Sequence, residues 1–237
     1  MKKLKAILFD LDGTLLPMDQ NEFMKAYFGR LAAALAPHGY EPRSLIDAVW
    51  AGTAAMVKND GSVTNEDAYW QRFTAIFGEE ALNEKDYLEQ FYKTDFENVR
   101  PSCGFDPTAG VVIAALKAKG YRLILATNPL FPHVATSARI RWAGLNEEDF
   151  ELVTTYENSR FTKPNLDYYR EILSLAGLQP DECMMVGNDV SEDMVAEELG
   201  MRVYLVTGCL LNKNNKDIIK YPSGDLDGLV TFVDTIN

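Results

Sequence analysis

The fold of this chain of 237 residues is decided by one stretch, AILFDLDGT, at positions 6–14. Four apolar residues run from Ala6 to Phe9 and stop at an acidic, glycine-containing turn. A short continuous apolar run that ends in a polar loop is typical of a buried strand in a parallel sheet. The stretch therefore predicts such a strand over 6–9, with Asp10 and Asp12 at its carboxyl end.

The same pattern, an apolar run before a polar loop, recurs later in the chain. It predicts further strands over 121–126, 151–153, 183–186 and 203–206. Helix-period segments that end at a glycine lie between them, over 107–119, 132–143, 166–176 and 191–199, and glycine is the usual residue just after a helix. Alternating strands and helices predict a Rossmann-like, doubly wound α/β fold with helices on both faces of a parallel sheet.

Residues 17–100 differ, because helix-period apolar spacing continues there without a β-rich run. Helices are predicted near 19–36, 43–57, 64–77 and 83–94. We therefore expect an all-helical cap of residues 17–100, inserted into a core made of residues 1–16 and 101–237. Trp50, Trp70, Tyr87 and Phe91 fit the interior of such a bundle, with stacking on a substrate as the alternative.

The charge balance limits the classes of partner. The chain has 23 Lys and Arg residues against 35 Asp and Glu residues, a formal net charge of −12. An acidic surface repels nucleic acid and anionic membranes, so neither is an expected partner. A small phosphorylated metabolite remains compatible, because a bound cation can meet its charge locally.

The cysteines and the apolar runs indicate a location. Cys103, Cys183 and Cys209 are far apart and form no CxxC pair, which argues against a disulfide framework and for a reducing compartment. No stretch approaches the roughly 20 apolar residues of a membrane span. We expect a cytoplasmic protein.

Ligands of an open parallel sheet bind beyond the carboxyl ends of its strands. The candidate site therefore consists of polar residues that follow a predicted strand, together with Lys163, which opens the helix before the strand over 183–186. These residues are Asp10, Asp12, Thr14, Thr127, Asn128, Lys163, Asp189 and Asp193. These residue types together suit a site that binds a metal ion and a phosphate. Asp10 with Asp189 or Asp193 would supply the hard oxygen ligands that suit Mg²⁺.

A carboxylate in this setting can attack phosphorus, and a second acid can serve the leaving group. Asp10 would form the aspartyl phosphate, and Asp12 would protonate the leaving oxygen and later deprotonate water. Thr127 would hold phosphate oxygens and Lys163 would balance their charge. Thr14 and Asn128 are candidate substrate-binding residues.

Each signal alone also has a structural interpretation. The DxDGT stretch could be an acidic turn, Thr127 a loop hydroxyl or helix N-cap, and Lys163 a surface lysine. Asp189 and Asp193 could be an N-cap and a first-turn acid. Their order along the chain and their placement at strand ends together favour a catalytic site.

Four stretches, FDLDGTL (9–15), LATN (125–128), KP (163–164) and VGNDVSED (186–193), resemble the motifs of the haloacid dehalogenase-like hydrolase superfamily. The helical insertion resembles that superfamily's type 1 cap. The resemblance implies that Asp10 is the nucleophile and a metal ligand, and that Asp12 is the general acid/base with its backbone carbonyl on the metal. It implies that Thr127 and Lys163 bind the phosphate, and that Mg²⁺ is the cofactor.

The fourth motif departs from the family pattern, which usually has an acid immediately after the glycine. This chain has Asn188 there, followed by Asp189. We expect Asp189 to be the direct ligand and Asp193 to act through water or a neighbour. The alternative alignment would make the neutral amide oxygen of Asn188 the ligand.

The second aspartate indicates the reaction, because members that dehalogenate lack an acid at the place of Asp12. The resemblance therefore implies a Mg²⁺-dependent phosphatase that hydrolyses a small-molecule phosphate monoester. The alternatives are a phosphomutase on the same scaffold and a receiver-type signalling phosphoacceptor, a class about half this length.

The cap itself is acidic, with 14 Asp and Glu residues against 8 Lys and Arg residues between positions 17 and 100, a net charge of −6. It is not a basic lid for a highly charged substrate. The candidates to face the site are Gln20, Asn21, Met24, Lys58 and Arg72.

Overall fold

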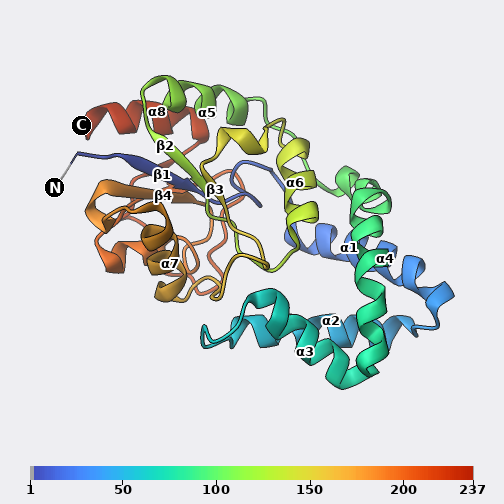
Figure 1. The fold of residues 1–237 in the computed structure, drawn as a ribbon. Coiled ribbons are helices and arrows are strands. Elements are labelled where there is room, and N and C mark those ends of the chain that lie inside the picture. The colour runs from blue at the N-terminus through green and yellow to red at the C-terminus, as the bar shows by residue number, and fades with distance from the viewer. Residues whose placement is uncertain (1–2, 237) are drawn as a thin grey trace.

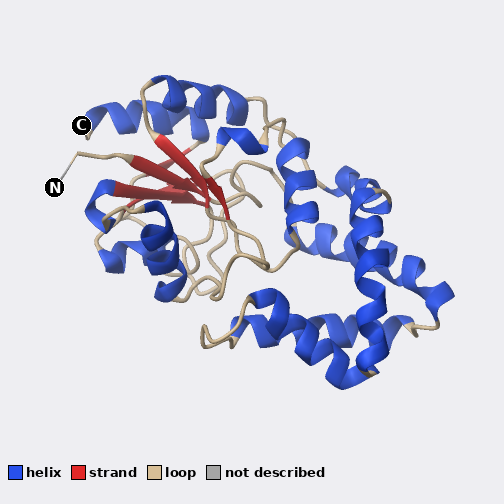
Figure 2. Ribbon diagram, in the orientation of Figure 1, coloured by secondary structure: helices blue, strands red, loops and turns tan. Residues whose placement is uncertain are grey.

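The computed structural model describes residues 3–236 and contains a six-stranded parallel sheet (Figures 1 and 2). The strands are β1 (Ala6–Phe9), β2 (Arg122–Leu125), β3 (Leu152–Val153), β4 (Cys183–Gly187), β5 (Arg202–Val206) and β6 (Ser223–Gly224). Their order is β3-β2-β1-β4-β5-β6, and each neighbouring pair is parallel. The order reverses at β1, so the sheet is doubly wound and has its switch point between β1 and β4. The predicted fold class is confirmed.

Helices cover both faces of the sheet because side chains alternate along each strand. Ile7 and Phe9 of β1 pack in one buried cluster with α5 (Thr108–Ala118) and α8 (Leu226–Thr235). Leu8 packs in a second cluster with α7 (Leu166–Ala176). In Figure 1, α5 and α8 lie on one side of the sheet and α7 lies on the other.

Two features differ from the sequence-based expectation. The segment after β4, predicted as a helix over 191–199, is a 3-10 helix that begins only at Met194 (η6, Met194–Leu199). The residues before it are held in a turn, because the Asp189 carbonyl accepts the amide of Asp193 at 2.9 Å. In addition, the last part of the chain contains the short edge strand β6 and helix α8, and the sequence analysis predicts neither of them.

The inserted segment forms four helices, α1 (Gln20–Leu35), α2 (Pro42–Val57), α3 (Asn65–Phe77) and α4 (Glu84–Lys93). Side-chain caps set the starts of α1, α2 and α3. The Asp19 side chain accepts the amides of Asn21 and Glu22 at 2.8 and 3.1 Å, and Thr64 accepts that of Asp67 at 3.1 Å. These helices match the four that the apolar spacing predicts in the cap.

The cap contacts the core at several places, among them the two linkers and the start of α3. The two linkers run side by side, with a bridge between Met18 and Cys103 and a hydrogen bond from the amide of Gly104 to the carbonyl of Pro17 at 2.7 Å. At the far end, the fully buried Asn65 at the start of α3 donates to the Phe161 carbonyl at 3.2 Å. The cap is thus joined to the core on both sides of the space between them.

The aromatic residues predicted for the cap interior are not all inside it. Trp70 and Phe91 are buried, but Trp50 is 50% exposed, so its assignment to the bundle interior is wrong. Trp50 lies on α2 against the ring of Phe28, with 5.4 Å between ring centroids.

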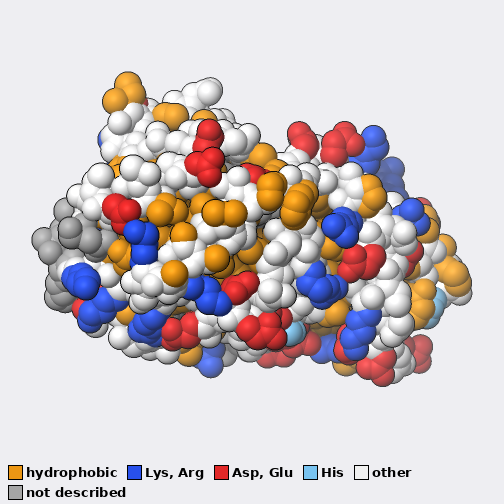
Figure 3. Space-filling model, turned by 90° about the horizontal axis from the view of Figure 1, so that it is seen from above, with side chains coloured by type: hydrophobic (Ala, Val, Ile, Leu, Met, Phe, Trp, Pro, Cys, Tyr) orange, Lys and Arg blue, Asp and Glu red, His pale blue; other side chains and the backbone are white. Residues whose placement is uncertain are grey.

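The outer surface carries charges of both signs. Viewed from above (Figure 3), acidic and basic side chains are interspersed, and hydrophobic side chains gather over the middle of this face. Within residues 3–236 no helix combines the length and the apolar character that a membrane crossing requires. The three cysteines are free thiols.

Candidate active site

The residues that follow β1, β2 and β4 meet at the carboxyl edge of the sheet. The backbone amide of Asp10 donates to the carbonyl of Val186 in β4 at 2.9 Å. The amide of Ala126, after β2, donates to the carbonyl at the end of β1 at 2.7 Å. Thr127 therefore follows the strand on one side of Asp10, and Asn188 follows the strand on its other side.

Lys163 joins two carboxylates at this edge. Its Nζ donates to Asp10 Oδ1 at 2.8 Å and to Asp193 Oδ1 at 2.7 Å, and its side chain is 1% exposed. Burial opposes the charged lysine, but the charges of Asp10 and Asp193 outweigh it and hold the pKa of Lys163 well above its usual value. Lys163 is thus a fixed buried cation rather than a surface lysine.

Asp193 uses both of its carboxylate oxygens inside the protein. Besides the bond to Lys163, its Oδ2 accepts the backbone amide of Asp189 at 2.9 Å. Gly187 makes room for this carboxylate, because a Cβ there would lie 2.1 Å from Asp193 Oδ2. Both oxygens of Asp193 are thus engaged within the protein, and the grouping of Asp193 with the metal stays a prediction.

Thr14 and Asn188 lie on the opposite side of Asp10. Thr14 Oγ1 is 3.2 Å from Asp10 Oδ2 and 3.0 Å from Asn188 Oδ1. Asn188 Nδ2 donates to the Cys209 carbonyl at 2.6 Å, so its amide oxygen faces Thr14 and Asp10. Gly13, with a φ of +88°, permits this approach, because a Cβ there would lie 2.3 Å from Asn188 Nδ2.

Asp189 has a different environment from the one expected. Its Oδ1 accepts the backbone amides of Ser191 and Glu192 at 2.7 and 3.0 Å, so the side chain closes the turn that follows β4. The side-chain oxygen of Asn188 lies on the other side of the Thr14 hydroxyl from Asp10 Oδ2. Asn188 and Asp189 both line the cavity described below, so the choice of Asp189 over Asn188 as the direct metal ligand stays a prediction.

Asp12 is paired with an arginine that the sequence analysis did not single out. Nη1 of Arg139, on α6 (His133–Trp142), forms an ion pair with Asp12 Oδ2. The Arg139 side chain is 1% exposed, whereas that of Asp12 is 24% exposed. The other oxygen, Asp12 Oδ1, is buried and has no hydrogen-bond partner within residues 3–236.

The position of Arg139 is fixed from several directions. Its Nη2 donates to Thr136 Oγ1 at 3.3 Å, its Nε to the Ala135 carbonyl at 3.4 Å, and its guanidinium lies 4.5 Å from the ring centre of Phe131. Burial raises the pKa of Asp12 even though Arg139 opposes that shift. The sequence signal for Arg139 is a charged residue between two apolar ones, Ala138 and Ile140. The structure buries both of these neighbours.

Thr127 and Asn128 have different places at the site. Thr127 is buried and lines the cavity described below, while its carbonyl is held by Tyr168 Oη at 2.8 Å. Asn128 Oδ1 accepts the amide of Lys163 at 3.2 Å, and its Nδ2 donates to Glu192 at 2.9 Å. Asn128 thus contacts Lys163 and also lines the cavity, and its role in substrate binding stays a prediction. Thr14 contacts Asp10 and does not line the cavity.

The composition of this edge fits a small divalent cation. Five carboxylates gather here, on Asp10, Asp12, Asp189, Glu192 and Asp193, against the two buried basic side chains of the described chain, Lys163 and Arg139. Within residues 3–236 no set of three His, Cys, Asp or Glu side chains is arranged to hold a metal alone. A metal here would therefore need a mixed set that includes amide or carbonyl oxygens. Carboxylates with such neutral oxygens form the donor set that Mg²⁺ accepts.

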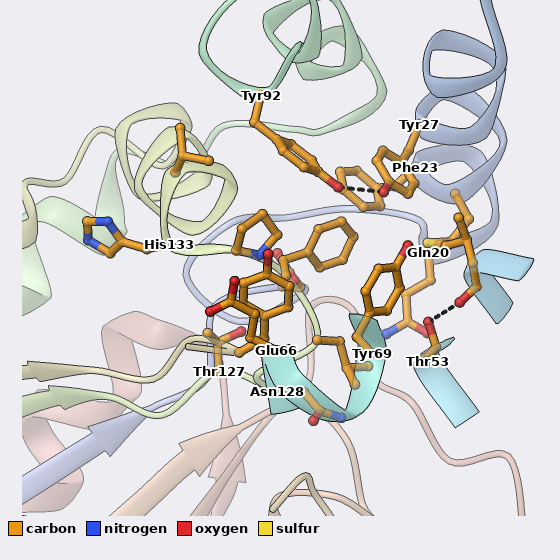
Figure 4. Close-up of a pocket in the computed structure, with 18 of the residues that line it drawn as sticks. Gln20, Phe23, Tyr27, Thr53, Glu66, Tyr69, Tyr92, Thr127, Asn128 and His133 are labelled. Carbon is orange, nitrogen blue, oxygen red and sulfur yellow. Dashed lines mark hydrogen bonds between the residues drawn. The ribbon is translucent and has the colours of Figure 1, made fainter. Parts of the chain in front are cut away.

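A cavity of about 730 Å³ extends from this edge to the inner wall of the cap. Asp10, Asp12 and Thr127 lie at its core end, and residues of all four cap helices line the other end. In Figure 4, Phe23, Tyr27 and Tyr92 form an aromatic wall opposite Thr127. Of the five predicted cap candidates, Gln20 and Met24 line this cavity, whereas Asn21, Lys58 and Arg72 do not.

Sheet, site and cap together define an α/β enzyme with a carboxylate-rich site beneath an inserted helical cap. A family model for haloacid dehalogenase-like hydrolases matches residues 4–208. The chain therefore belongs to the haloacid dehalogenase-like hydrolases, as its motifs predict, and it is a hydrolase.

Known proteins give a consistent comparison. The chain is 30% identical to glyceraldehyde 3-phosphate phosphatase of Methanothermobacter thermautotrophicus, in an alignment that covers 99% of this chain and 97% of that protein. Its fold is similar to that of a phosphatase of the same family from Thermococcus onnurineus, with a TM-score of 0.58, 19% identity, and coverage of 97% of this chain and 98% of the other. It is also similar to that of a 2-haloacid dehalogenase from Pseudomonas syringae pv. tomato, with a TM-score of 0.63, 20% identity, and coverage of 99% and 100%.

Proposed function

We propose that this protein is a Mg²⁺-dependent phosphatase that hydrolyses a small-molecule phosphate monoester through an aspartyl phosphate on Asp10. The observation that carries the proposal is the pairing of two aspartates with separate cations at one end of a cavity. Lys163 engages Asp10, and Arg139 engages Asp12. The relative that is a glyceraldehyde 3-phosphate phosphatase supports hydrolysis of phosphate esters.

Asp10 is suited to be the nucleophile. Lys163 holds its Oδ1 by a charge-assisted bond, which fixes the orientation of the carboxylate. One carboxylate oxygen of Asp10 attacks phosphorus, the bond from phosphorus to the ester oxygen breaks, and the alcohol departs. Lys163 also balances negative charge on the phosphoryl oxygens, and the Thr127 hydroxyl can donate to one of them.

Asp12 is suited to be the acid and then the base. Its Oδ2 is engaged by Arg139, so the unpartnered Oδ1 is the oxygen that can carry the proton. Asp12 gives this proton to the departing alcohol oxygen and takes one back from the water that attacks the aspartyl phosphate. Water then releases inorganic phosphate and restores Asp10.

Mg²⁺ would be held by the Asp10 carboxylate and by the side-chain oxygen of Asp189 or Asn188, with the backbone carbonyl of Asp12 as a further ligand by family resemblance. When bound, the ion supplies positive charge that offsets the phosphate dianion and the surplus of carboxylates. Thr14, between Asp10 and Asn188, keeps these two side chains in place.

The test is hydrolysis of an aryl phosphate by purified protein with Mg²⁺, scored as released inorganic phosphate. Asp10→Asn should lose essentially all turnover while its circular dichroism and melting temperature stay close to those of the native protein. Near-native turnover by this variant would rule out the covalent mechanism. Conversion of a sugar 1-phosphate to its isomer without phosphate release would indicate a mutase instead.

A further inference from the structure

The cap end of the cavity has a chemistry of its own. Its wall is formed mainly by aromatic side chains, from Phe23, Tyr27 and Phe28 on α1, Trp50 on α2, Tyr69 on α3 and Tyr92 on α4. Figure 4 shows Phe23, Tyr27, Tyr69 and Tyr92 arranged around the same space. Aromatic faces bind flat apolar groups and cations, and they offer little to a small polyol.

Some of the hydroxyl groups of this wall are engaged within the protein. Tyr27 Oη and Tyr92 Oη lie 2.7 Å apart and form one hydrogen bond with each other, which uses one of their two protons. Thr53 Oγ1 donates to the Val49 carbonyl at 2.9 Å, within its own helix. These contacts reduce, but do not remove, the hydrogen-bond groups that the wall offers, since Gln20, Tyr69 and Trp70 also line it.

The charges at the cap end are unfavourable for an anion. Glu66, Asp86 and Glu89 line it, and the one cap cation among the described lining residues, Lys85, is bound to Glu66 Oε1 at 3.1 Å. Lys213 also lines the cavity, but it belongs to the core end. It lies two residues after Leu211, whose amide donates to the Asn188 carbonyl at 2.9 Å beside the proposed phosphate site.

The size of the cavity adds to this picture. At about 730 Å³ it lies within the range of pockets that hold drug-sized ligands. A ligand that fills it would contact both Asp10 at the core end and the aromatic wall of the cap. A second phosphate or a carboxylate near the cap would meet Asp86 and the Glu66–Lys85 and Glu89–Lys93 pairs, whose lysines are already engaged.

We propose that the alcohol part of the substrate is a flat aromatic group without negative charge, stacked against the cap wall at Trp50 and Tyr69, and that it carries a single phosphate ester. This inference rests on the proposed phosphatase activity and narrows it to one substrate class. The proposed stacking accounts for the exposure of Trp50, because its half-exposed ring borders the cavity and is free to receive a ligand.

The experiment compares three primary alkyl phosphates, so that the acidity of the leaving alcohol is similar throughout. They are 2-(1-naphthyl)ethyl phosphate, n-butyl phosphate and the phosphate ester of 4-hydroxybutanoate. We expect kcat/KM to be about tenfold to a hundredfold higher for the naphthyl compound than for the butyl compound, because stacking contributes about 1–3 kcal/mol per ring and 1.4 kcal/mol is tenfold. The carboxylate compound should be the poorest.

Three variants assign the preference to the cap wall. Trp50→Ala should reduce the naphthyl-to-butyl ratio of kcat/KM about tenfold, mainly through KM, and Trp50→Phe should retain most of it. Val57→Ala, also exposed on α2 but outside the cavity, is the matched control and should leave the ratio unchanged. Glu66→Gln releases Lys85 and should raise kcat/KM for the carboxylate compound severalfold.

The outcomes separate the two proposals. Hydrolysis of the butyl or carboxylate compound at least as efficiently as the naphthyl compound would overturn the substrate class and leave the phosphatase intact. A preference for naphthyl that Trp50→Ala does not change would also overturn it. If no phosphate ester, aryl phosphate included, releases phosphate, the proposed function fails and the substrate class fails with it.

Discussion

Replacement of Lys163 by methionine tests whether one buried cation holds the site together. In the native protein its Nζ is shared by Asp10 and Asp193, and the side chains of Lys163 and Asp193 are each 1% exposed. Lys163→Met keeps the length and removes the charge, which leaves two buried carboxylates without their common partner. Removal of one member of a buried ion pair costs roughly 3–5 kcal/mol, because the remaining charge is neither paired nor hydrated.

The lower end of that range is expected for this site. Burial already raises the pKa of Asp193 in the presence of Lys163. Without the lysine, Asp193 can take up a proton and so avoid part of the penalty. A loss of about 3 kcal/mol should lower the melting temperature by about 6–12 °C, since 1 kcal/mol corresponds to roughly 2–4 °C for a chain of this size.

The assay is thermal unfolding at neutral pH in EDTA, with two further variants. Lys58→Met changes an exposed cap lysine and should stay within about 0.5 kcal/mol of the native protein. Lys163→Met combined with Asp193→Asn should be more stable than Lys163→Met alone, because the uncompensated charge is gone.

The pH dependence has a defined sign. With its folded pKa above its unfolded pKa, Asp193 binds more protons in the folded state, so stability increases as the pH falls through the folded pKa. Lys163 lowers the pKa of Asp193, which is about 7 in the native protein, so without the lysine Asp193 takes up its proton at a higher pH. The deficit of Lys163→Met should therefore shrink as the pH falls toward about 7 and stay constant below it. A melting temperature within about 2 °C of the native value at neutral pH would refute the reasoning, since it would mean that the pair contributes nothing.

Three other perturbations have equally defined outcomes. Asp12→Asn should lower kcat for alkyl phosphates by about 10²–10⁴ and for nitrophenyl phosphate much less, because only the poor leaving group needs a proton; equal losses for both would contradict the acid role. EDTA should abolish phosphate release and added Mg²⁺ should restore it, and full activity in EDTA would exclude a metal. Gly13→Ala places a Cβ 2.3 Å from Asn188 Nδ2 at a φ of +88° and should cost about 1–3 kcal/mol in thermal unfolding, whereas Gly110→Ala, with open space around it, should cost nothing.

The core fold was accessible to sequence analysis because its signals are local. Each parallel strand is a short apolar run that ends in a polar loop, and each cap helix repeats apolar residues at the helical period. The signals fail where an element carries no such pattern. The edge strand β6 is a Ser-Gly pair that pairs with β5 only through its place in the sheet. The turn before η6 is set by hydrogen bonds to Asp189, which no periodicity records.

The sequence predicts which residues form the candidate site, but it does not predict the individual role of each. Strand ends in a parallel sheet share one edge, so the convergence of Asp10, Thr127 and Lys163 follows from topology. Asn188 and Asp189 are adjacent in the sequence, which does not say which of the two side chains lies beside Thr14. That choice is fixed by tertiary contacts, namely the close packing of Gly13 and the carbonyl of Cys209.

Three aspartates of the site have different surroundings because two buried cations divide them. Lys163 and a backbone amide engage both oxygens of Asp193. Lys163 engages one oxygen of Asp10, and Arg139 engages one oxygen of Asp12, so each of these two keeps a second oxygen that no basic side chain occupies. Arg139 lies 127 positions from Asp12, and nothing in its helix distinguishes it from Arg141 except burial. The division of labour between Asp10 and Asp12 therefore depends on a residue that only the folded chain brings to the site.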